Sequence, residues 1–197
     1  MESWLMLPRL EGQEEMADRF HFHMKSASIS LQEHHLLIQR YDKLSNAPYR
    51  PIQIYLDHLR SAFNIGNILR TTEAFRLGTI VYSDKMPDSS HPKVIKTAMG
   101  AAPPFLHASI DACHRPLIAL ETAHGAHPIH TFSFPESFTL ILGNEEEGIR
   151  PSLLEKVDAI IEIPLPGSKN SLNVASAFAI ATAFIRSKDC KKSSCSL

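Results

Sequence analysis

Cysteine is scarce in this chain. Its 197 residues include three cysteines, Cys113, Cys190 and Cys195, an odd number spread widely along the sequence. Such a set argues against a disulfide framework and is typical of proteins kept in a reducing compartment. Cys190 and Cys195 have no second pair at the spacing of a tetrahedral zinc site, and the scattered histidines share no helical face. We therefore expect no bound metal.

The chain also lacks an excess of charge of either sign and any long apolar run. The formal net charge is -1, with charged residues at 21% and hydrophobic residues at 44%. This balance excludes a global polycation, but it leaves room for a local basic face that binds phosphates. No apolar stretch approaches the length of a membrane span, and the first residues carry no basic leader. We expect a cytoplasmic protein that does not contact a membrane.

Composition and the pattern of apolar residues divide the chain into three regions. Residues 1–48 are rich in charges and histidines, and a loose helical spacing over residues 31–41 predicts a helical N-terminal extension. From residue 49 onward, short apolar runs alternate with helical patterns. We predict one compact domain over residues 49–188, followed by a polar, basic C-terminal tail over residues 189–197.

The central region has the pattern of an α/β fold. Runs that are apolar on both faces predict strands at residues 52–56, 79–82, 105–110, 129–132, 138–142 and 159–163. Helical patterns lie between or after them, at residues 65–75, 91–99, 151–157 and 171–185. Strands of this kind alternating with helices imply a mostly parallel sheet flanked by helices. Ligands of such sheets bind at the carboxyl ends of the strands.

Three polar segments follow predicted strands at that edge. In the first, residues 64–70, Gly66 is expected to allow a tight entry into a helix that Asn64 caps. Arg70 follows within two turns, so it can face the same cleft as Asn64. A helix cap followed by an unrelated surface arginine would give the same pattern.

The second segment joins Gly143 to three consecutive acids, of which Glu145 comes first after the strand. The glycine is expected to let a ligand approach the backbone closely. The segment is not a nucleotide-phosphate loop, because it has too few glycines and no lysine. A solvated acidic turn before a helix that begins at Pro151 would explain the same residues.

The third segment runs from Pro164 through a proline- and glycine-rich loop to Ser171 and Asn173. Ser171 is the predicted helix cap. Asn173 in the first helical turn is unexpected, because asparagine is a poor helix former away from caps. The helix that follows is alanine-rich, which suits a close helix contact or a subunit interface, with ordinary core packing as the alternative.

Taken together, these segments resemble the three motifs of the SpoU class of the SPOUT superfamily, the S-adenosylmethionine-dependent RNA 2′-O-ribose methyltransferases. The match covers about residues 50–187. Each motif alone is weak, whereas three in order at fitting separations are specific. The matching residues are Asn64, Gly66 and Arg70, then Leu142, Gly143, Asn144 and Glu145 with Glu147 and Gly148, then Ile163, Pro164, Gly167, Ser171, Leu172, Asn173 and Val174.

The resemblance implies a site and a fold. It assigns Arg70 to the ribose hydroxyl that accepts the methyl group, with Asn64, Glu145, Ser171 and Asn173 completing the catalytic set. It places the S-adenosylmethionine cofactor against Leu142, Gly143, Ile163, Pro164, Leu165, Gly167 and Leu172. It also implies a deep trefoil knot in the C-terminal part, and a homodimer formed through the knot region and the last helix.

The implied partner is RNA, either tRNA or rRNA. A basic face for it would draw on Lys85, Lys93, Lys96, Arg150, Lys169, Arg186, Lys188, Lys191 and Lys192, although a solvated mixed surface is the simpler explanation for any single lysine. The alternative function is a catalytically inactive RNA-binding or assembly factor on the same fold. The intact polar residues of the three motifs argue against it.

Overall fold

The computed structural model describes residues 12–27, 45–84 and 86–193. Contacts divide the chain into two units, Met1–Asn46 and Ala47–Leu197. The first unit contains helix α1 (Gln13–Ser26). The helical spacing over residues 31–41 lies outside the described residues. Within the described ranges, no helix is long and apolar enough to cross a membrane.

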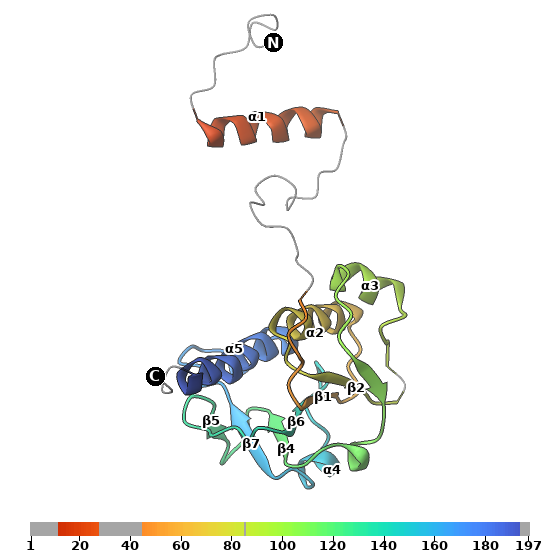
Figure 1. Ribbon diagram of the computed structural model, residues 1–197, viewed down its shortest axis with the longest axis vertical. Helices are drawn as coiled ribbons and strands as arrows, with labels where there is room; N and C mark the ends of the chain where they lie inside the picture. The colour runs from red at the N-terminus through yellow and green to blue at the C-terminus, as the bar shows by residue number, and fades with distance from the viewer. Residues whose placement is uncertain (1–11, 28–44, 85, 194–197) are drawn as a thin grey trace, which may run out of the picture. The chain divides into compact units, whose positions relative to one another are not determined.

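The second unit is built on a seven-stranded sheet in which every pair of neighbouring strands is parallel. This confirms the predicted α/β fold with a parallel sheet flanked by helices (Figure 1). The strands lie in the order β3-β2-β1-β6-β4-β7-β5. Their bounds are β1 (Ile52–Leu56), β2 (Thr79–Tyr82), β3 (Phe105–His107), β4 (Leu117–Leu120), β5 (His127–Pro128), β6 (Phe138–Leu142) and β7 (Ala159–Glu162).

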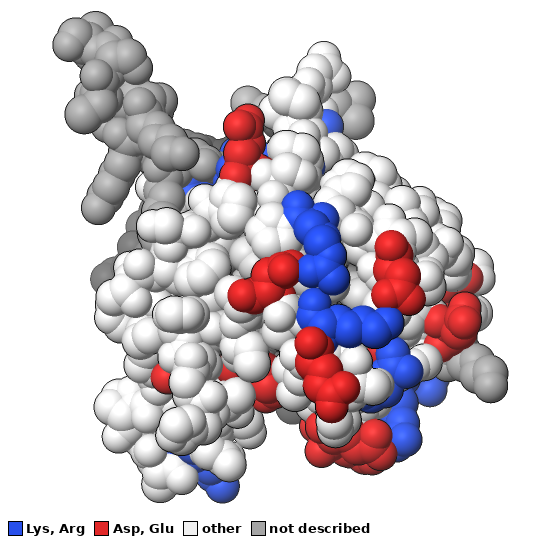
Figure 2. Space-filling view, turned by 90° about the horizontal axis from the view of Figure 1, so that it is seen from below, with Lys and Arg blue, Asp and Glu red and all other residues white. Residues whose placement is uncertain are grey.

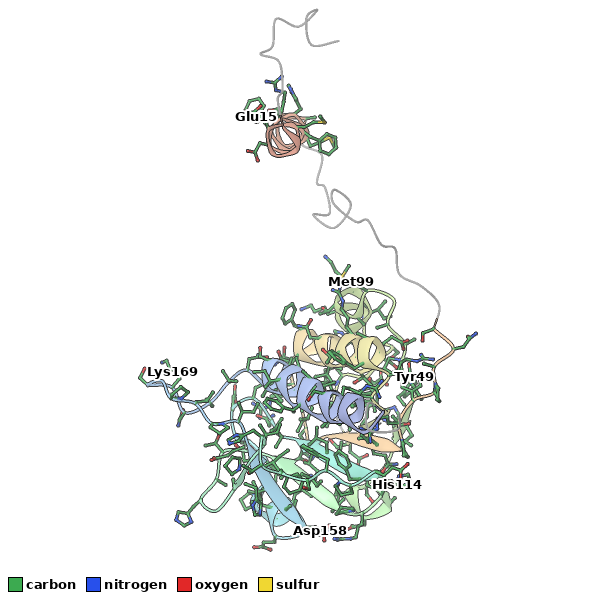
Figure 3. The ribbon with its side chains drawn as sticks, turned by 60° about the vertical axis from the view of Figure 1, so that its left-hand side comes forward. Glu15, Tyr49, Met99, His114, Asp158 and Lys169 are labelled. Carbon is green, nitrogen blue, oxygen red and sulfur yellow. The ribbon has the colours of Figure 1, made fainter. Side chains whose placement is uncertain are left out.

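Helices cover both faces of this sheet. Alternate strand residues such as Ile54 and Leu140 pack on one face in the same core as Phe178 of α5, while Tyr55 and Leu153 belong to the core of the other face. Figure 3 shows α2 and α5 side by side over the sheet, and the two helices are in contact. The helices of this unit are α2 (Ala62–Phe75), α3 (Pro92–Ala98), α4 (Pro151–Leu154) and α5 (Val174–Ser193), with a 3₁₀ helix η3 (Ile110–Ala112).

Several elements differ from the sequence prediction. Residues 117–120 form the interior strand β4, which the apolar pattern did not reveal, because four apolar residues fit a helix as well as a strand. The strand predicted at residues 129–132 is wrong: after the short β5, the amides of Thr131 and Phe132 donate to the Pro128 carbonyl in a turn. The last helix begins at Val174 rather than at Ser171, and it extends to Ser193 into the predicted tail.

The start of α2 also differs from the prediction. Ser61, and not Asn64, caps the helix, because the Ser61 hydroxyl accepts the Asn64 amide at 3.3 Å. Gly66 lies inside the helix where α2 crosses α3. A Cβ at this position would lie 2.5 Å from the Cβ of Thr97, so only glycine lets the two helices approach this closely.

Candidate active site

The acidic loop after β6 folds back on itself. The backbone amides and carbonyls of Asn144 and Gly148 exchange hydrogen bonds of 2.9 and 3.0 Å. The Asn144 side chain accepts from the amides of Glu146 and Glu147 and donates to the His58 carbonyl. A Cβ on Gly143 would lie 2.4 Å from the Gly148 carbonyl carbon. Gly143, which was expected to let a ligand approach, instead allows the backbone of Gly148 to pack closely against it.

Glu145 connects this loop to the start of α2. Its carboxylate accepts hydrogen bonds from the amides of Arg60 and Ser61, at 3.1 and 3.0 Å, and from the Asn64 side-chain amide at 3.0 Å. Partial burial opposes ionisation, but the hydrogen bonds from Arg60, Asn64 and Ser61 outweigh it and hold the pKa of Glu145 below its ordinary value. Glu145 is therefore an ionised acceptor that fixes the orientation of Asn64.

Asn64 in turn contacts the start of α5. Its side-chain oxygen accepts from the side-chain amide of Asn173 at 3.0 Å, and the Asn173 oxygen caps α5 by accepting from the amides of Ala175 and Ser176. Asn173 is therefore the helix cap, which explains an asparagine at this position. One residue from each of the three motifs thus takes part in a single hydrogen-bonded chain.

This chain of hydrogen bonds predicts a pH-dependent stability. Glu145→Gln is expected to lower the free energy of unfolding by about 0.5 kcal/mol near neutral pH, a small effect because solvent screens an exposed group. Because the folded-state pKa is depressed, the contribution is complete above the ordinary pKa of 4.5 and is lost as pH falls through the folded-state value. Denaturation at a series of pH values measures it. Glu147→Gln, whose carboxylate accepts no hydrogen bond within the described residues, is the control, and a difference from wild type that does not change with pH would refute the prediction.

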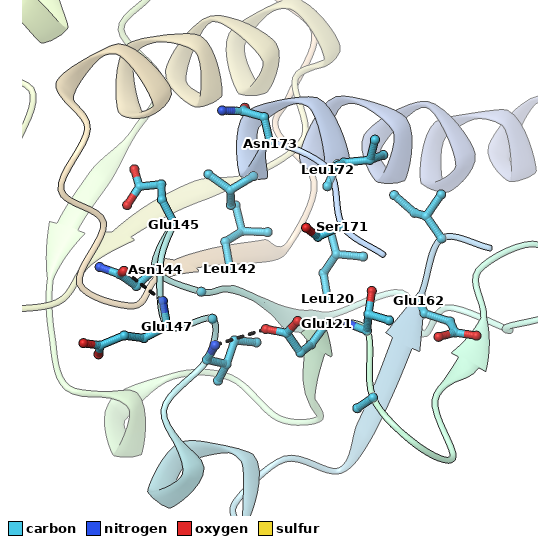
Figure 4. Close-up of a pocket in the computed structure, with 18 of the residues that line it drawn as sticks. Leu120, Glu121, Leu142, Asn144, Glu145, Glu147, Glu162, Ser171, Leu172 and Asn173 are labelled. Carbon is cyan, nitrogen blue, oxygen red and sulfur yellow. Dashed lines mark hydrogen bonds between the residues drawn. The ribbon is translucent and has the colours of Figure 1, made fainter. Parts of the chain in front are cut away.

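A cavity of about 510 Å³ opens beside these hydrogen-bonded residues, at the carboxyl ends of β4, β6 and β7 and the start of α5. Figure 4 shows Glu145 and Asn173 on one side of it. The volume is in the range of small-ligand sites. Among the residues predicted to bind the cofactor, Leu142, Gly143, Ile163, Leu165 and Leu172 line the cavity. Ser171 lines it as well, whereas Pro164 and Gly167 are exposed and lie outside its lining.

The structure does not bring Arg70 to this cavity within one chain. Its side chain is exposed, is not part of the lining, and donates to the Met99 sulfur at 2.9 Å, next to α3. Gly66, one helical turn earlier, also faces α3. In a single chain, the Asn64 side chain contacts Glu145 and Asn173, whereas the Arg70 side chain contacts Met99.

The motifs also missed a buried ion pair next to the site. Asp57 follows β1, is 0% exposed, and binds Arg150 through its carboxylate at 2.6 to 3.2 Å. The hydrogen bond that the Arg150 side chain donates to Asp57 raises the pKa of Arg150, so the guanidinium stays charged. The pair ties the end of the acidic loop to the end of β1. An aspartate directly after a buried strand is the sequence signal that could have indicated it.

The match to known proteins agrees with this geometry. The SpoU rRNA Methylase family profile matches residues 51–183. The chain is 31% identical over 147 residues to the 23S rRNA (guanosine(2553)-2′-O)-methyltransferase RlmP of Bacillus subtilis, covering 68% of this chain and 57% of that protein. It is 25% identical over 156 residues to the 23S rRNA (guanosine-2′-O-)-methyltransferase RlmB of Neisseria meningitidis, covering 75% and 62%. The chain therefore spans less than two thirds of these relatives.

Solved structures are similar as well. An AdoMet-bound rRNA methyltransferase from Sinorhizobium meliloti superimposes with a TM-score of 0.65 at 26% identity, covering 76% of this chain and 62% of that one. The SpoU methyltransferase AviRb from Streptomyces viridochromogenes, in complex with AdoMet, has a TM-score of 0.66 at 21% identity, covering 74% and 63%, which supports the fold alone. Family profile, relatives and fold agree: this chain belongs to the SpoU rRNA methylase family.

Proposed function

We propose that this chain is an S-adenosylmethionine-dependent RNA methyltransferase that methylates a ribose 2′-hydroxyl of tRNA or rRNA in the cytoplasm. The observation that carries the proposal is the convergence of Asn64, Glu145 and Asn173 beside one cavity in a chain of this family. The relatives are named as rRNA 2′-O-methyltransferases, and the similar structure from Sinorhizobium meliloti holds AdoMet. The catalytic domain in this proposal is residues 49–188.

The lining of the cavity suits this cofactor. Leu142, Ile163 and Leu172 offer apolar surface for an adenosine, and the backbone around Gly143 and Leu165 would hold its polar edges. When bound, the cofactor supplies an electrophilic methyl group on a sulfonium. The enzyme then has to orient the acceptor hydroxyl and exclude competing water, so positioning carries much of the catalysis.

Arg70 is proposed to position the acceptor hydroxyl. A guanidinium stays protonated in proteins, so Arg70 cannot take the proton, but it can donate hydrogen bonds to the oxygen and stabilise its developing negative charge. In the single chain, its hydrogen-bond partner is the Met99 sulfur, a weak acceptor that RNA can replace.

A second copy of the chain is proposed to complete the site. Arg70 lies away from the cavity of its own chain, so a homodimer is the simplest way to bring a guanidinium to the donor. Leu172, just before α5, leaves 41% of its surface exposed, and Ile180 and Phe184 within α5 each leave 36%. Such apolar groups support an interface through this helix and the adjoining segment, where the proposed trefoil knot would lie.

The proposed RNA surface leaves out several cations that are paired with acids. On the face in Figure 2, Lys and Arg lie among Asp and Glu. Arg60 pairs with Glu146, Arg115 with Asp158 and Lys156 with Asp111, and Arg150, expected on a basic face, is bound to Asp57. Of the other predicted cations, Lys93, Lys96 and Lys169 are exposed, and Lys85 lies outside the described residues. Lys93 and Lys96 share α3 and precede Met99, so we place the RNA backbone there.

The direct test uses the full-length chain, labelled S-adenosylmethionine and total RNA from cells that lack the modification. We expect label in RNA at a ribose 2′-oxygen, mapped by resistance of the adjacent phosphodiester to alkaline cleavage. Label on a base would reject ribose methylation. Cofactor binding without transfer to any RNA would favour the inactive RNA-binding factor.

A further inference from the structure

The cavity carries charge of one sign. Five carboxylates are part of its lining, and among the described residues that line it there is no lysine, arginine or histidine. Two of these charges are already compensated: Glu146 pairs with Arg60 at 2.7 Å, and Glu145 accepts three N–H groups. The five residues are Glu121, Glu145, Glu146, Glu147 and Glu162.

Glu121 differs from Glu147 and Glu162 because two backbone amides hold its carboxylate in place. It follows β4 directly and is only partly exposed. One carboxylate oxygen accepts the Thr122 amide at 3.0 Å, and the other accepts the Ile149 amide at 3.1 Å (Figure 4). Gly148 passes so close that a Cβ there would lie 2.6 Å from the same oxygen. The loop therefore packs directly against this carboxylate.

Glu121 keeps an uncompensated negative charge at the cavity. No ion pair to it forms within the described ranges of the chain. A carboxylate has about four lone-pair positions, so two backbone amides leave acceptor capacity free. Because the group is already fixed and partly shielded from water, its field acts on a ligand without the cost of reorientation.

The chemistry of methyl transfer gives this charge a use. Transfer breaks the methyl–sulfur bond, leaves the electron pair on sulfur, and joins the methyl to the ribose oxygen, whose proton goes to solvent. The donor is a sulfonium, and the product is the thioether S-adenosylhomocysteine, which keeps the same nucleoside and amino-acid parts but has lost the methyl group and the charge. The two ligands therefore differ by one methyl group and by the positive charge on sulfur.

We propose that Glu121 is a specificity-determining residue of the donor site, which favours the cationic donor over its neutral thioether product. This inference rests on the proposed function. The fixed carboxylate stabilises the sulfonium and loses that interaction once the methyl has left. The product therefore binds more weakly than the donor, although both ligands share the same nucleoside and amino-acid parts.

The test is the ratio of two dissociation constants, measured by calorimetry on the full chain with S-adenosylmethionine and S-adenosylhomocysteine. Glu121→Gln keeps the shape and removes the charge. We expect donor affinity to fall about tenfold, roughly 1.4 kcal/mol, and product affinity to change less than about twofold. Glu136→Gln, an exposed acid outside the cavity lining, should change neither constant.

Equal weakening of both ligands would show that Glu121 only supports the loop, and no change would show that its charge does not reach the sulfonium. Either result overturns the inference. If Glu121→Gln binds neither ligand, Glu121→Asp decides, because it keeps the charge: a preserved preference for the donor supports the inference and a lost preference overturns it. A wild-type chain that binds neither ligand would instead reject the proposed function.

Discussion

Replacing Arg70 by lysine is expected to lower the rate constant for methyl transfer by about 100-fold or more, while donor affinity stays within about twofold of wild type. The reason is geometric. A guanidinium presents several donors in a rigid plane, whereas an ammonium is a point charge on a flexible stem. A group that holds the acceptor hydroxyl and stabilises its negative charge needs that plane. Because Arg70 is not part of the cavity lining in its own chain, the variant should still bind the donor.

Single-turnover methylation of the mapped RNA, together with calorimetric donor binding, measures both parts. Arg115→Lys is the matched control, because Arg115 is exposed and pairs with Asp158 just before β4 and β7, at the opposite edge of the sheet. Its rate should be close to wild type. A near-normal transfer rate in Arg70→Lys would remove Arg70 from the chemistry. A large loss of donor affinity would make it part of the donor site instead.

Much of the site could be predicted from the sequence because the sheet is parallel, so that loops after different strands meet at one edge. Asn64, Glu145 and Asn173 come after β1, β6 and β7, and the carboxyl ends of parallel strands meet at one edge. That rule needs only correct strands, and these three were correct within a residue. The hydrogen bonds that join the three residues are its direct consequence.

Arg70 shows why spacing along a helix does not by itself fix the direction of a side chain. Six residues along an α-helix correspond to about 600° of rotation, which leaves Arg70 about 120° away from Asn64 around the axis. Gly66 and Arg70 are four residues apart and share the face that meets α3. Being less than two turns apart therefore did not put Asn64 and Arg70 on one side of the helix.

Other details depended on choices between similar residues or on distant contacts. Ser171 and Asn173 are both good helix caps, so the sequence does not decide between them. In the structure Asn173 is the cap, and its side chain also donates a hydrogen bond to Asn64, 109 positions away in the chain. The partner of Asp57 lies 93 positions away, at the end of a loop whose shape the sequence does not reveal. A buried acid after a buried strand predicts that a partner exists, but not which cation it is.

The pair of Asp57 and Arg150 is expected to give the largest effect on stability. Arg150→Met removes the guanidinium from the fully buried carboxylate of Asp57. Of the hydrogen bonds that residue 150 donates to Asp57, only the one from its backbone amide, at 3.2 Å, remains. Removing one partner of a buried pair costs about 3–5 kcal/mol, and the lower end applies because 43% of the Arg150 side chain is exposed. At about 3 kcal/mol, the thermal midpoint of the second unit should fall by roughly 6–12 °C.

A double-mutant cycle separates the lost pair from the unpaired charge. Asp57→Asn combined with Arg150→Met removes the buried charge together with its partner, so the double variant should be more stable than Arg150→Met alone. Urea denaturation of the three variants and wild type measures the four free energies. Arg115→Met, which breaks an exposed ion pair, should cost less than about 1 kcal/mol. If the two single effects simply add, the carboxylate of Asp57 does not depend on Arg150, and the acidic loop must be held to β1 by the Asn144 side chain and Glu145 instead.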